Sequence, residues 1–61
     1  MPAYRALLLK AKDVPGWTEA FLADSDDAAL DRATAIFQAW AHEYLACELW
    51  QDLRLVRRLQ R

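Results

Sequence analysis

Residues 47–59 constrain the fold most, because this segment is compatible with either a β-hairpin or the end of a long helix. In a hairpin, Trp50 lies opposite Leu55, which gives an aromatic–aliphatic contact across the strands. Glu48 then lies opposite Arg57, and the two side chains carry opposite charges. Both pairs favour the hairpin.

The same hairpin distributes apolar side chains over both faces of a sheet, since successive residues of a strand point to opposite sides. One face receives Trp50, Leu55 and Leu59, and the other receives Cys47, Leu49 and Val56. A chain of 61 residues offers one helix, which covers one face only. We expect the face with Trp50, Leu55 and Leu59 to be covered by a second copy of the chain, which predicts a homodimer.

The first 23 residues predict another antiparallel hairpin. Tyr4 to Lys10 is a short apolar run, and bounded runs of this length are typical of buried strands. Pro15-Gly16 is the strongest turn signal in the chain, and Trp17 to Ala23 alternates as a returning strand would.

A helix is predicted from about Asp26 to about His42. Asp24 or Ser25 is suited to cap it, because a side-chain oxygen there accepts from free backbone N–H groups. Apolar residues recur at three- and four-residue steps and form one stripe. These are Leu30, Ala33, Phe37, Trp40, Ala41 and Tyr44.

The predicted fold class is therefore α+β with the order ββαββ, an antiparallel sheet with one helix packed on one face, in a single domain of residues 1–61. The alternative is an N-terminal hairpin followed by one long helix from Asp26 to Leu59, because neither glycine nor proline follows Gly16. The last turn of the hairpin contains Asp52-Leu53, and leucine tolerates a positive φ poorly. A four-residue loop, Gln51 to Arg54, keeps the Trp50–Leu55 register without that strain.

Four stretches in order, Tyr4 to Leu9, Phe21 to Leu30, Glu48 to Trp50 and Arg54 to Leu59, give the chain a resemblance to a known group. It resembles short uncharacterised bacterial proteins with a strand–strand–helix–strand–strand plan, which implies this fold and no activity. A weaker similarity, on Gly16-Trp17 and Asp26 to Leu30, is to HicB-type antitoxins. That similarity implies a nucleic-acid-binding regulator as the alternative function.

Cofactors and catalysis are not expected. Cys47 is the only cysteine, so no internal disulfide forms, and with the single His42 it provides too few ligands for a structural zinc site. The same two residues lack a third group to orient them as a nucleophile and its base. Since a domain of this size buries only about 60% of its unfolded surface, oligomerisation is the expected source of extra stability.

Charge is unevenly distributed, although the net charge is only −1. The candidate contacts to a polyanion are Arg54, Arg57, Arg58 and Arg61. On the hairpin Arg57 and Arg58 point to opposite faces, which divides the basic surface and disfavours nucleic-acid binding.

The run Leu7-Leu8-Leu9 is too short for a signal peptide, and no apolar stretch reaches the length of a membrane span, so a cytoplasmic protein without membrane contact is expected. The expected function is a small interaction or adaptor module that self-associates through its sheet and is not an enzyme. A different protein is the other partner considered.

Overall fold

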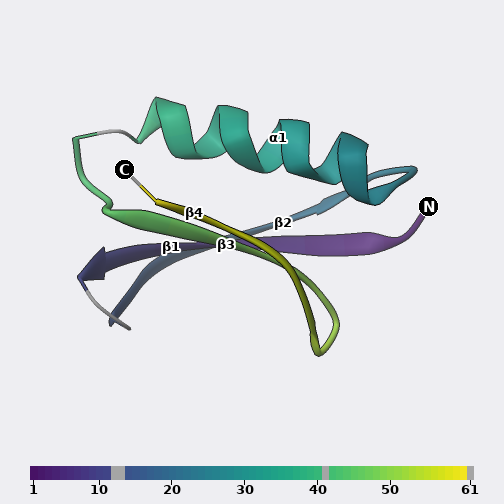
Figure 1. The fold of residues 1–61 in the computed structure, drawn as a ribbon, viewed down its shortest axis with the longest axis horizontal. Helices are drawn as coiled ribbons and strands as arrows, with labels where there is room; N and C mark the ends of the chain where they lie inside the picture. Colours follow the sequence, from purple (N-terminus) through teal and green to yellow (C-terminus); the bar gives the residue numbers. More distant parts are fainter. Residues whose placement is uncertain (12–13, 41, 61) are drawn as a thin grey trace.

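The chain folds as an α+β unit with one four-stranded antiparallel sheet and one helix (Figure 1). The computed structural model describes residues 1–11, 14–40 and 42–60. The elements are β1 (Ala3–Ala11), β2 (Val14–Leu22), α1 (Asp26–Ala39), β3 (Ala46–Gln51) and β4 (Arg54–Gln60). The strand order is β2-β1-β3-β4, which confirms the predicted ββαββ class, and the long-helix alternative is wrong.

Gly16 lies inside β2 rather than in a turn, so the predicted turn at Pro15-Gly16 is wrong. Leu8 pairs with Trp17 and Leu9 pairs with Pro15, which leaves Gly16 as an extra residue in the ladder. This is a β-bulge, and residues 12–13, which join the two strands in the sequence, lie outside the described residues.

The bulge allows the ring of Tyr44 to contact the backbone of β2. A Cβ atom at Gly16 would overlap Tyr44 Cε1 and would lie 2.8 Å from Lys10 Cγ. Tyr44 is buried, and the next residue, Leu45, donates its backbone N–H to Leu9 O at 2.8 Å. Gly16 is therefore needed for close approach, because its φ is not positive.

We predict that Gly16→Ala destabilises the fold by about 1–3 kcal/mol, the usual cost of overpacking. Without the clash, the same change would stabilise the chain by about 0.4–1 kcal/mol, because it restricts the unfolded state. Urea denaturation measures the sign. In a Tyr44→Ala background the penalty should shrink, and an unchanged penalty would contradict the contact.

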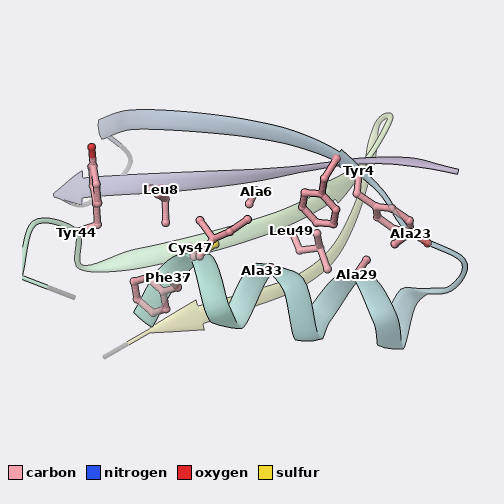
Figure 2. Packing of buried hydrophobic residues seen from close by; sticks show 12 residues of the cluster. Tyr4, Ala6, Leu8, Ala23, Ala29, Ala33, Phe37, Tyr44, Cys47 and Leu49 are labelled. Carbon is pink, nitrogen blue, oxygen red and sulfur yellow. The ribbon is translucent and has the colours of Figure 1, made fainter. Parts of the chain in front are cut away.

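Helix α1 covers one face of the sheet, and the core lies between them (Figure 2). Its buried side chains are Ala29, Ala33, Ile36 and Phe37. Ala29 and Ala33 are fully buried, as is Ala6 of β1, and small side chains let a helix approach a sheet closely. The remaining core residues come mainly from the two central strands and the flanking segments: Tyr4, Leu8, Phe21, Ala23, Tyr44, Cys47 and Leu49.

The helix ends at Ala39, three residues before the predicted His42. Trp40 leaves the helical conformation, donates its N–H to Phe37 O at 3.2 Å and is 39% exposed rather than part of the stripe. The sequence has no stop signal here. The helix is followed by a turn in which Glu43 and Tyr44 donate their N–H groups to Trp40 O, and the Tyr44 ring then lies against Gly16.

The start of the helix is tied to both hairpins. Ser25 is the N-cap, as one of the two predicted candidates, and its Oγ accepts from Ala28 N at 3.1 Å. Buried Tyr4 stacks on Phe21 and donates its hydroxyl to Asp26 Oδ1 at 2.8 Å.

Arg54 of β4 completes this link with two parallel hydrogen bonds to the Asp26 carboxylate, at 2.9 and 3.0 Å. The guanidinium and the Tyr4 hydroxyl hold the pKa of Asp26 below its ordinary value of 3.8, the guanidinium having the larger effect. One carboxylate thus joins β1, α1 and β4.

A lowered pKa in the folded state means that Asp26 stabilises the fold above about pH 4, and that this stabilisation is lost as the pH falls through the folded pKa. We predict that Asp26→Asn reduces the urea midpoint at pH 7 and flattens the decline of stability between pH 5 and 2. Asp27→Asn, an exposed carboxylate in the same turn, is the matched control and should lower the midpoint less. Equal effects of the two variants would contradict the role of the link.

Candidate interaction surface

The face of the sheet opposite α1 is the candidate site, and we call it the open face. Its members follow from strand alternation, since Tyr4, Ala6 and Leu8 point toward the helix. They are Arg5, Leu7 and Leu9 on β1, Thr18, Ala20 and Leu22 on β2, Ala46, Glu48 and Trp50 on β3, and Leu55 and Arg58 on β4. None of the described helix residues covers this face (Figure 1).

The two ends of the open face differ in exposure. At one end Leu9 and Ala46 form a pair and are only 3% and 4% exposed. At the other end Leu55 is 47% exposed and Leu53, in the β3–β4 turn, is 94% exposed. We call this second end, with Leu7, Trp50, Leu53 and Leu55, the exposed half of the open face.

The predicted pairing of Trp50 with Leu55 is confirmed, whereas the pairing of Glu48 with Arg57 is wrong. A bulge between Leu49 and Trp50 inserts Val56 into the ladder, so Glu48 pairs with Arg58 instead. These two side chains form an ion pair at 2.6 Å, and Glu48 also accepts from Trp50 Nε1 at 3.1 Å. The Glu48–Arg58 ion pair therefore lies at the centre of the open face, between apolar side chains.

The same bulge moves one candidate self-association residue to the other side of the sheet. Leu59 pairs with Cys47 and packs against the core, so its predicted place beside Trp50 and Leu55 is wrong. In the predicted register Leu59 pairs with Ala46, and the one extra residue on β4 shifts that pairing by one position. Trp50 and Leu55 lie on the open face as predicted.

The turn between β3 and β4 consists of two residues, and the predicted four-residue loop is wrong because Gln51 and Arg54 are themselves paired. Only Asp52 has a positive φ, 53°. Aspartate tolerates this conformation better than leucine, so Leu53 escapes the expected strain. Arg5 Nη2 donates to Asp52 O at 3.0 Å and fixes the turn against β1.

A hollow of about 250 Å³ lies between this turn and the sheet. It is lined by Arg5, Leu7, Thr18, Trp50, Asp52 and Leu53. Sequence patterns indicate neither Leu53 as a surface residue of the candidate site nor this hollow, since both depend on the position of the β3–β4 turn.

The candidate polyanion contacts do not gather in one place. Arg54 is paired with Asp26 on the helix side, and Arg58 is paired with Glu48 on the open face. Arg57 lies opposite Leu49, which faces the helix, and Arg61 lies outside the described residues. The three described arginines therefore form no common basic patch.

Cys47 is fully buried against α1, and burial raises the pKa of its thiol to about 11, with a smaller effect from Glu48. His42 is exposed in the segment after the helix. Within residues 1–11, 14–40 and 42–60, no three histidine, cysteine or acidic side chains lie close enough to hold a metal ion.

No protein-family model, curated protein or solved structure matches this chain. In the part of the chain that the structure describes, no helix is long and apolar enough to cross a membrane.

Burial and the raised pKa of Cys47 predict a thiol that does not react in the native state. At pH 8 a chromogenic disulfide reagent should label Cys47 only after local or global opening, and rapidly in denaturant. Leu45→Cys introduces a thiol at a position that is 59% exposed and should add one fast equivalent. Fast labelling of native wild-type protein would contradict the burial of Cys47.

Proposed function

We propose that the protein is a small interaction module that forms a homodimer through the exposed half of the open face. The observation that carries the proposal is the exposure of Leu53 and Leu55 beside half-buried Trp50, on a sheet face that no described helix covers. Apolar groups that gather on one surface typically mark an interface.

The apolar side chains of the exposed half would form a small interface. The molecule measures 30 × 21 × 15 Å, so half of its broadest side is smaller than the roughly 800 Å² per partner of a standard-size interface. Burial of a large apolar side chain contributes about 1.5–3 kcal/mol. A few such side chains matter in a domain with a core this small, since whole domains are stable by only about 5–15 kcal/mol.

The charges on this face favour a second copy over a polyanion. Arg5 and Arg58 are accompanied by Glu48, and Asp52 lies in the adjacent turn. A patch with equal numbers of positive and negative groups is able to complement itself across a two-fold axis. A nucleic acid would instead meet two carboxylates, so the antitoxin-type regulator is the less supported alternative.

The proposal assigns a binding role rather than a catalytic one. Cys47, the single nucleophile candidate of the sequence analysis, is buried under α1, and its thiol is protonated at neutral pH because its pKa is raised. Among the described residues, exposed His42 makes no contact with the Cys47 thiol and therefore does not activate it as a nucleophile.

Light scattering after gel filtration tests the dimer. The wild type should elute with twice the chain mass of 7.1 kDa, and Leu55→Asp should weaken dimerisation at least tenfold, because a carboxylate would be buried in the interface. Leu45→Asp, at the opposite end of β3, should leave the wild-type mass unchanged. The dimer should also persist in 1 M salt.

A folded wild type that stays monomeric at all concentrations would overturn the homodimer. Binding of a DNA or RNA oligonucleotide that weakens steeply with salt would favour the regulator instead.

A further inference from the structure

We infer that Leu53 is the anchor of the dimer contact: the Leu53 side chain of each copy inserts into the hollow beside the β3–β4 turn of the other copy. The inference rests on the proposed homodimer and adds the residue and the receiving site. The occupant of the hollow is a leucine side chain from a second copy of this chain.

Leu53 lies at the tip of a projecting hairpin and is exposed to solvent. It is 94% exposed, the largest value among the exposed large apolar residues of the described chain. The β3–β4 hairpin bends away from α1, so its tip projects beyond the sheet on the side of the open face (Figure 1). The bond from Arg5 to Asp52 O restrains the backbone of the tip, which lowers the backbone entropy that is lost when Leu53 binds.

The hollow has the size and the lining that a leucine side chain requires. Its volume of about 250 Å³ exceeds the roughly 150 Å³ of an apolar cavity that accepts benzene. Leu7, Trp50 and the copy's own Leu53 supply the apolar part of the lining, while Arg5, Thr18 and Asp52 supply the polar part. Apolar groups beside polar ones are also found in the anchor sites of known interfaces.

The position of Leu53 at the edge of this hollow makes the surface self-complementary. A two-fold axis beside the turn places each Leu53 over the hollow of the other copy, so one residue type makes two equivalent contacts. The buried end of the open face, where Leu9 and Ala46 lie, takes no part in this contact.

Sedimentation equilibrium of Leu53→Ala tests the anchor. The dimer Kd should rise at least about tenfold, because three carbons are lost from each of two contacts. Leu45→Ala is the matched control, since Leu45 is 59% exposed and lies at the opposite end of β3, and its Kd should change less than about threefold. Both residues are exposed, so the monomer fold should be retained, as far-UV circular dichroism verifies.

A crosslink locates the contact directly. Leu53 is replaced by the photo-crosslinker p-benzoylphenylalanine in one isotopically labelled population, which is mixed with unlabelled wild type. Irradiation should join position 53 to a peptide of the other isotope that contains Leu7, Thr18 or Trp50. If crosslinks form only within one isotope while Leu55→Asp still disrupts the dimer, the anchor role of Leu53 is overturned. The proposed homodimer itself is then retained. A monomeric wild type would overturn both.

Discussion

The structure depends on one constraint: a single helix of 14 residues has to complete the core of a four-stranded sheet. The helix does so by approaching closely, with Ala29 and Ala33 against the sheet, and by ionic attachment at its first turn, where Asp26 binds β1 and β4. Among the described residues, no second helix covers the opposite face of the sheet. Leu53 and Leu55 therefore remain exposed on that side, where Glu48 is paired with Arg58.

Local signals in the sequence account for the parts of the fold that were predicted correctly. A bounded apolar run and an alternating segment predict the first two strands, and Ser25 precedes a run with helical spacing. Trp50 and Leu55, which are close in sequence across a short turn, predict the last two strands. Each of these signals lies within a few residues of the structure it predicts. The class ββαββ therefore follows from the order of the elements alone.

The errors arise where one extra residue or a distant contact decides the outcome. Pro15-Gly16 looks like a turn, but Gly16 serves the ring of Tyr44, which is 28 residues away and outside any local pattern. Val56 gives no sign that it is the bulged residue, since valine is common in regular strands. This single insertion moved Leu59 to the core side and exchanged Arg57 for Arg58 as the partner of Glu48. Alternation alone thus identifies Trp50 and Leu55 on the candidate surface but not Leu53, which lies in the turn between β3 and β4 rather than in a strand.

The dispersal of the β4 arginines has a consequence for the geometry of assembly. Strands β2 and β4 are the two edges of the sheet, and an unprotected edge recruits further strands into open-ended fibres. Pro15 and the adjacent bulge interrupt the outer hydrogen-bonding row of β2, while Arg54, Arg57 and Arg58 place three cations along the seven residues of β4. Lateral polymerisation is discouraged at both edges. The proposed contact through the open face therefore does not have to compete with strand addition at these edges.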